Sequence, residues 1–167
     1  MGCLGVHFSI SEEEVRTLRG FTTDKARLDY FKNELEEKLY ALDANFHADS
    51  DKAWDAMHRA LTDGQLDWDN GSYPLNHAVM GGENLYHHDD YIMVLKSLQQ
   101  VRDLAKALEP ITEADFRPRY FAIDTKTYTM PLSEDDFQYT WEWFQEVRGL
   151  FSRAAADGRW VLFTASQ

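Results

Sequence analysis

A helical segment in the first half of the chain contains the side chains best suited to chemistry. Asp55 precedes His58 by three residues, so on a helix its carboxylate can orient the imidazole for general acid–base work. The more common alternative is structural: His58 binds a backbone carbonyl, while Asp55 caps the helix or pairs with Arg59. The sequence does not determine whether His58 meets the next histidine, His77. The candidate ligand-binding residues are Trp54, Asp55, His58, His77 and Tyr91.

Metal and cofactor motifs are weaker. The run His87–Asp90 has ligand residue types, but on a strand it offers only two ligands to one side, whereas a divalent metal usually takes three or four. A third ligand would have to come from His58 or His77. The segment Asp67–Gly71 resembles a calcium loop, yet Ala78 stands where a bidentate Glu is needed. Glycine-rich phosphate loops and nucleophile elbows are absent from the sequence, so we predict neither a metal nor a cofactor.

The balance of charge restricts the class of partner. The chain has 29 acidic and 17 basic residues and a formal net charge of -12. Nucleic acids and anionic membranes attract basic proteins, so we expect neither as a partner. The excess of carboxylates fits plain solubility, and it equally fits a basic protein partner.

The single cysteine and the lack of targeting signals indicate a compartment. Cys3 has no second cysteine with which to form an intramolecular disulfide, so a reducing environment suits the chain. The N-terminus lacks the basic and apolar regions of a signal peptide, and no apolar run approaches the ~18 residues that span a bilayer. We therefore expect a cytoplasmic protein, whose oligomeric state the sequence does not determine.

Strand and helix signals alternate along the chain. Apolar residues predict strands over 2–10, 90–96 and 159–165. One long apolar stripe predicts a helix over 24–42. Helix starts are marked by a hydroxyl side chain with an acid or amide three positions later, at Ser11 and Glu14, Ser97 and Gln100, Thr112 and Asp115, and Ser133 and Asp136.

Proline, glycine and loop residues set the expected boundaries. We expect a loop over 43–50, and a helix through Trp54 that begins after Ser50 or Asp51. Pro74 is placed to open a short helix that ends before the Gly81–Gly82 pair. Pro118 is expected to limit the helix that starts at 112 to little more than one turn.

Together these elements predict a helix-rich α+β fold in a single domain spanning 1–167. Its small sheet is built from the N-terminal, middle and C-terminal strands and is covered by helices. The continuous apolar run over 90–96 indicates a strand inside the sheet. Matching apolar stripes on two helices predict one core that contains Trp54, Met57, Leu61, Phe137, Trp141 and Phe144.

The order and spacing of several motifs resemble the YfbM-like family of small bacterial proteins. The resemblance is carried by Lys52, Trp54, Asp55, His58, Leu61 and Thr62, then by Pro74, Leu75, Ala78, Val79 and Gly81, and near the end by Phe116, Arg117, Arg119, Tyr120 and the closing strand. It implies an α+β fold and a bacterial cytosolic setting. It does not imply a catalytic mechanism.

Two functional hypotheses follow from these observations. The first is a non-enzymatic protein-binding module, of a regulatory or immunity type, whose acidic surface meets a basic partner. The alternative is a small enzyme or small-molecule-binding protein with a pocket lined by Trp54, His58, His77 and Tyr91. A deep pocket that joins these four residues would favour the alternative, and a broad acidic face without a cleft would favour the first.

Overall fold

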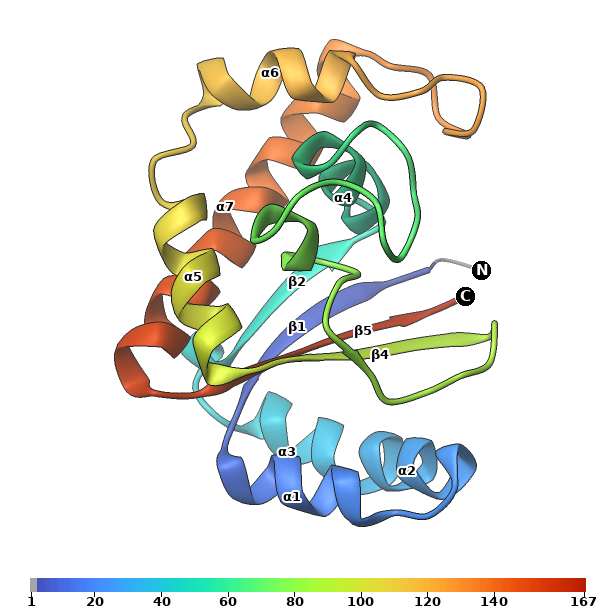
Figure 1. Cartoon of the computed structure of the whole chain (residues 1–167), viewed down its shortest axis with the longest axis vertical. Coiled ribbons are helices and arrows are strands. Elements are labelled where there is room, and N and C mark those ends of the chain that lie inside the picture. The colour runs from blue at the N-terminus through green and yellow to red at the C-terminus, as the bar shows by residue number, and fades with distance from the viewer. Residues whose placement is uncertain (1–2) are drawn as a thin grey trace.

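An antiparallel sheet of five strands separates two layers of helices (Figure 1). The computed structural model describes residues 3–167. The strands are β1 (Gly5–Ile10), β2 (His47–Asp51), β3 (Glu83–Asn84), β4 (Tyr91–Lys96) and β5 (Trp160–Ser166), in the spatial order β2-β1-β5-β4-β3. The first and last of them in sequence pair at the centre, so the start of β1 and the end of β5 lie at the same end of the sheet.

The three predicted strands are confirmed as β1, β4 and β5, and β4 is an interior strand as expected. The expectation of a loop over 43–50 is wrong, because a short 3-10 turn (Ala44–Phe46) leads directly into β2. The sequence of β2, His-Ala-Asp-Ser-Asp, has low intrinsic strand propensity. Its pairing with β1 at the edge of the sheet stabilises it, and only the tertiary structure supplies that pairing.

The lower layer in Figure 1 consists of α1 (Glu12–Gly20), α2 (Asp24–Tyr30) and α3 (Glu36–Ala41). The expected helix over 24–42 is present, but a π-helical turn (Phe31–Leu35) interrupts it between α2 and α3. This layer covers one face of the sheet with a small core of its own. Its buried members include Phe8, Leu18, Phe31, Leu39, Met93 and Leu162.

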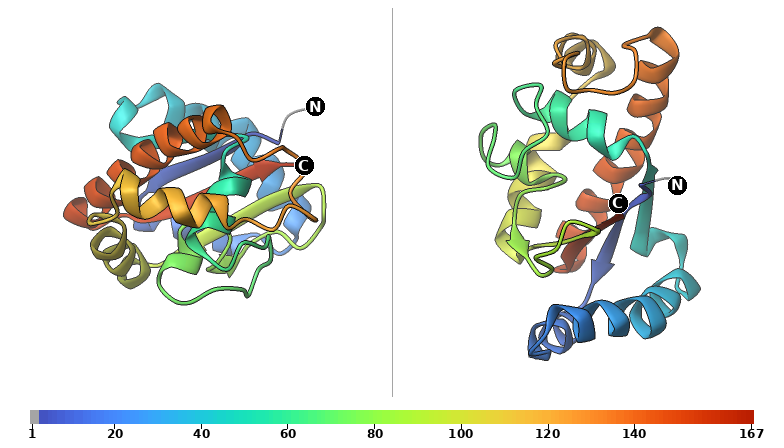
Figure 2. Two further views of the ribbon diagram at one scale, coloured as in Figure 1. Left: turned by 90° about the horizontal axis from the view of Figure 1, so that it is seen from above. Right: turned by 90° about the vertical axis from the view of Figure 1, so that its right-hand side faces the viewer.

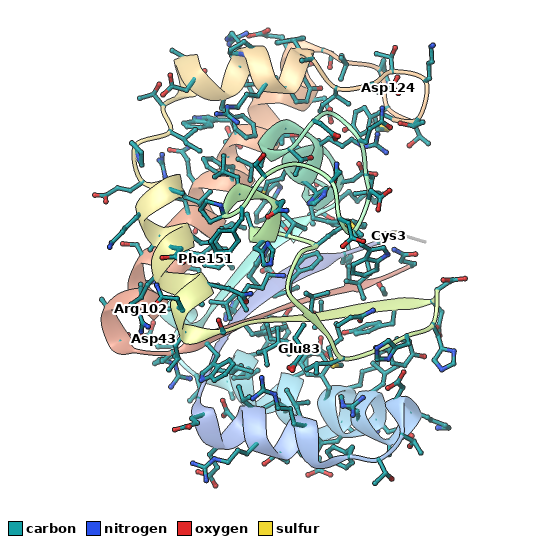
Figure 3. The ribbon with its side chains drawn as sticks, in the orientation of Figure 1. Cys3, Asp43, Glu83, Arg102, Asp124 and Phe151 are labelled. Carbon is teal, nitrogen blue, oxygen red and sulfur yellow. The ribbon has the colours of Figure 1, made fainter. Side chains whose placement is uncertain are left out.

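The upper layer consists of α4 (Trp54–Leu61), α5 (Leu98–Leu108), α6 (Glu113–Phe121) and α7 (Glu134–Asp157). The larger core lies between it and the sheet, and Figure 3 shows Phe151 in this layer. The predicted common core is confirmed, since it contains Trp54, Met57, Leu61, Phe137, Trp141 and Phe144. The two layers on opposite faces of the sheet are also clear in the second view of Figure 2.

Local capping explains where most helices begin. The capping boxes at Ser11, Ser97 and Thr112 are present, and the Ser133 side chain accepts from the backbone N–H of Asp136. The helix α4 differs, because its N-cap is Ala53 and the Ser50 hydroxyl instead donates to the Gly5 carbonyl.

Two expectations that depended on proline are corrected. The helix α6 continues through Pro118 to Phe121, because burial of Phe116 and Tyr120 on its inner face offsets the lost backbone hydrogen bond. After Pro74, only a 3-10 turn (Leu75–His77) forms in place of the expected short helix.

The observed architecture is the α+β class expected from the sequence, with the predicted strands at the heart of one sheet. Within the described residues, no helix is long and apolar enough to cross a membrane.

Candidate functional site

The sheet divides the five candidate residues between its two faces. Trp54 and His58 lie on the upper face, where the Trp54 ring packs 5.8 Å from that of Phe163. Tyr91 belongs to the core on the lower face. The structure therefore does not join Trp54, His58 and His77 with Tyr91 in one pocket.

The α4 candidates have structural contacts. His58 is 1% exposed, and its Nε2 lies 2.8 Å from Oδ1 of Asn70. Burial lowers the pKa of His58, so the ring is neutral at physiological pH. Asp55 forms an ion pair with the buried guanidinium of Arg59, and the Trp54 indole donates to the Cys3 carbonyl at 2.8 Å. These contacts hold α4 to the neighbouring loops.

His77 has a different hydrogen-bond partner from that of His58. Its Nδ1 is 2.7 Å from Oδ1 of Asn76, and the edge of its ring meets Tyr73 at 5.1 Å. It lines a hollow of about 280 Å³ together with Trp68 and the glycines Gly81 and Gly82.

The histidine-rich segment before β4, residues 87–90, contacts the carboxylate of Asp24. Nδ1 of His87 lies 2.9 Å from Oδ2 of Asp24, and Asp90 accepts from the Tyr86 hydroxyl. Over residues 3–167, no group of three or more His, Cys, Asp or Glu side chains is arranged to hold a metal ion.

Two buried basic residues were not anticipated from the sequence. Lys96 and His7 are both fully buried on the upper face of the sheet. Nζ of Lys96 donates to the Val79 carbonyl, and Nε2 of His7 lies 2.7 Å from the Ala78 carbonyl oxygen. Burial, with the adjacent Lys96, lowers the pKa of His7 to about 3. These contacts fasten the 78–79 segment onto the sheet.

A cleft of about 580 Å³ opens at the end of the sheet where both termini lie. Its lining comes from the ends of β1, β4 and β5, from the π turn and α3, and from β2 and α7. Figure 3 labels Cys3 near this end. We call it the Tyr91 cleft; its lining residues are Leu4, Gly5, Val6, Lys32, Glu36, Tyr40, Asp49, Asp51, Tyr91, Trp143, Thr164 and Ser166.

Three irregularities of the backbone converge on the Tyr91 cleft. The π turn ends immediately before Glu36 and includes Lys32, so it directs both side chains to the same wall. The pairing of β1 with β2 shifts register between Gly5 and Val6. Opposite that shift, Asp51 adopts a positive φ of 45°. π turns, bulges and strained residues are concentrated at functional sites, which distinguishes this cleft from the other hollows.

The electrostatics of the Tyr91 cleft are dominated by carboxylates. Glu36, Asp49 and Asp51 line it, and none of them takes part in an ion pair among the described residues. The basic residue of the lining is Lys32, whose Nζ lies 4.6 Å from the centre of the Tyr91 ring. Burial raises the pKa of the Glu36 carboxyl and of the Tyr91 phenol.

Aromatic side chains supply the apolar part of the lining. Tyr91 is 6% exposed, whereas Tyr40 is 42% exposed and Trp143 is half-buried. Burial and the nearby Asp49 carboxylate raise the pKa of the Tyr40 phenol, whose hydroxyl lies 3.4 Å from Oδ1 of Asp49. The cleft thus combines three aromatic side chains, of which Tyr40 is exposed, with negative charge.

The sequence contained a signal for one wall of this cleft. Lys32, Glu36 and Tyr40 recur at intervals of four, which places them on one side of a helix, about 100° around it from the apolar stripe. Such a polar face is usually solvated, so the spacing alone does not distinguish the wall of a ligand site from an ordinary surface. Only the fold brings it against the ends of β1, β4 and β5.

The fold and cleft define a class of α+β proteins with one antiparallel sheet between two helical layers. Residues 1–164 match a family described as a domain of unknown function, DUF1877, and the chain belongs to that family. The fold is similar to the crystal structure of a protein of unknown function, YfbM from Escherichia coli. The TM-score is 0.68 at 21% identity, over 97% of this chain and 99% of that one. The resemblance to the YfbM-like family is thereby confirmed. A comparison with curated proteins gives no match.

Proposed function

We propose that this protein is a non-enzymatic binding protein and that the Tyr91 cleft is its ligand site. The observation that carries the proposal is the cleft itself, where a volume of about 580 Å³ coincides with the π turn and the strained Asp51. Ligand sites of small molecules typically occupy ~300–1,000 Å³ and combine apolar walls with a few polar groups. Of the five candidates from the sequence, Tyr91 lines this site.

The side chains of the cleft favour recognition over catalysis. The phenols of Tyr40 and Tyr91 have raised pKa values, so at neutral pH they are uncharged hydrogen-bonding groups and poor general bases. The α4 histidine, His58, lies on the other face of the sheet and does not line the cleft. Glu36, whose carboxyl pKa is raised by burial, is the one group that favours the alternative of a small enzyme.

A role in binding another protein is compatible with the same site. The net charge of -12 favours a basic partner, and a basic partner presents lysine and arginine side chains that a cleft of this size can accept. Our proposal of a regulatory or immunity-type role rests on that charge.

A thermal-shift screen tests the proposal. The protein is melted with a panel of positively charged, negatively charged and neutral metabolites, alongside two tryptophan variants. Ser166→Trp fills the cleft from an exposed position at the end of β5, and Ser152→Trp adds the same side chain on an exposed position of α7. We expect ligands that raise the Tm of the parent and of Ser152→Trp, but not of Ser166→Trp.

A panel without any stabilising compound contradicts the proposal, as do ligands that stabilise Ser166→Trp as much as the parent. Glu36→Gln separates the two functional classes. If the protein only binds, the ligand stays chemically unchanged with both the parent and Glu36→Gln. If it is an enzyme, the parent converts the ligand and the variant does not.

A further inference from the structure

We propose that the Tyr91 cleft binds an organic cation and that Lys32 occupies the cation position in the free protein. This inference rests on the proposed function and adds to it the chemical class of the ligand. It follows from the types of side chain in the cleft, from their charges and from the position of one ammonium group.

Negative charge exceeds positive charge around the cleft. Its titratable carboxylates are Glu36, Asp49 and Asp51, and its lining contains one ammonium, that of Lys32. The Asp51 carboxylate accepts from the Tyr139 hydroxyl at 2.6 Å, so a neutral donor holds it in place without cancelling its charge. A cation that enters the cleft therefore gains attraction from three carboxylates that form no ion pair among the described residues, although the Lys32 charge already acts on Glu36.

Aromatic faces stand beside these carboxylates. Tyr40, Tyr91 and Trp143 all line the cleft, and electron-rich rings attract ammonium and guanidinium groups through their quadrupoles. An anion would meet three carboxylates and the Tyr91 face on which the Lys32 ammonium already lies. The combination of rings and carboxylates distinguishes this lining from a phosphate or carboxylate site.

Lys32 shows where such a cation would sit. Its Nζ lies 4.6 Å from the centre of the Tyr91 ring, within the range of a cation–π contact, although the side chain as a whole is exposed. A long exposed lysine moves aside at little cost. A ligand cation displaces the Lys32 ammonium from the ring, so Lys32 competes with the ligand.

The cationic group can come from a free metabolite or from a side chain of a basic protein. Choline represents the first source, and its uncharged isostere 3,3-dimethylbutan-1-ol is the matched control. Capped tripeptides with a central arginine or lysine represent the second source. The affinities of all four probes are measured by isothermal titration at low salt with the intact protein.

The variant Lys32→Met gives the sharpest result. We expect it to tighten binding of the cations by about threefold or more, because it removes both a like charge and the competitor on the Tyr91 ring. Lys25→Met removes the same charge from an exposed position in α2, where Lys25 pairs with Asp29, and should leave the affinity unchanged. Glu36→Gln should weaken the cations and not the uncharged isostere.

Several outcomes overturn the inference. They are an isostere that binds as tightly as choline, weaker cation binding by Lys32→Met, and no binding by any of the cations. If a neutral or anionic compound binds the parent and not Ser166→Trp, the cleft remains the ligand site and only the cation is rejected. If the cations bind Ser166→Trp and the parent equally, the proposed function itself fails. Binding of the peptides without choline identifies a protein as the source.

Discussion

The Lys32 ammonium lies 4.6 Å from the centre of the Tyr91 ring, and the two residues reach each other from the π turn and from β4. This contact joins the lower helical layer to the sheet at the wall of the Tyr91 cleft. Tyr91 therefore belongs both to the lower core and to the lining of the cleft.

Substitution of Tyr91 should reveal how much of its contribution comes from the ring. Tyr91→Phe keeps the aromatic face, so we expect cation binding to remain within about threefold of the parent. Tyr91→Ala removes a ring that is 6% exposed and should destabilise the fold by about 3–5 kcal/mol. Chemical denaturation and titration of both variants measure the two effects. Loss of binding in Tyr91→Phe with an intact fold would instead make the hydroxyl the main recognition group.

Trp54 should be a major contributor to stability. Its ring is 4% exposed and packs on Phe163 and on the Gly5 backbone, where even a Cβ would lie 2.6 Å from the indole. We expect Trp54→Ala to lower the free energy of unfolding by about 3–5 kcal/mol. Trp68→Ala, at a position 41% exposed, is the control and should lower it by less, about 1–2 kcal/mol. Equal denaturation midpoints for the two variants would show that Trp54 is not packed as described.

Lys96 should make the folded state more stable as pH rises. Burial lowers the pKa of its ammonium well below the ordinary value, so the unfolded chain binds a proton that the folded chain releases. Between the lowered and the ordinary pKa, stability therefore increases by up to about 1.4 kcal/mol per pH unit. Stability is measured from about pH 8 to about pH 9.5. The tyrosines, whose pKa values are raised, contribute to the pH dependence of stability mainly above about pH 10.

The test compares Lys96→Met with the parent over that range. We expect the variant to be more stable than the parent at about pH 8 and to lose the rise with pH, because methionine fills a similar volume without a charge. Lys106 is exposed on α5, so Lys106→Met should keep the parent's slope of stability against pH. A slope that survives in Lys96→Met would assign the effect to other groups.

Pro118 should cost stability in α6. It lies inside the helix Glu113–Phe121, where it cannot donate to the backbone. Pro118→Ala restores that donor, and we expect a gain of about 2 kcal/mol after the greater freedom of the unfolded chain is taken into account. A denaturation curve measures the gain. A loss of stability in Pro118→Ala would mean that packing of the proline ring contributes more to stability than the restored hydrogen bond.

The sequence predicted the elements whose signals are local. Ser11, Ser97 and Thr112 fixed three helix starts through capping boxes, and the apolar run of 90–96 identified β4 as an interior strand. It did not predict β2 or the passage of α6 through Pro118, because tertiary pairing and burial override weak or unfavourable local propensity.

The candidate site was harder to predict than the fold. The pairing of Asp55 with Arg59 was one of the alternatives open from the sequence. The opposite placement of Trp54 and Tyr91 follows from the alternation of strand faces and from which helices cover each face. A sequence pattern does not show which helices cover which face of the sheet. For that reason the contact between Tyr91 and Lys32 could not be predicted from the sequence.

The most direct test of the binding site is a map of amide chemical shifts in a nuclear magnetic resonance titration. The labelled protein is titrated with the best ligand of the screen, and the shifts are placed on the fold. We predict that the largest changes fall on the π turn, on Glu36 and Tyr40, and on the ends of β1, β4 and β5 around Thr164. Changes centred on His77 and Trp68, with the Tyr91 cleft unaffected, would contradict the account.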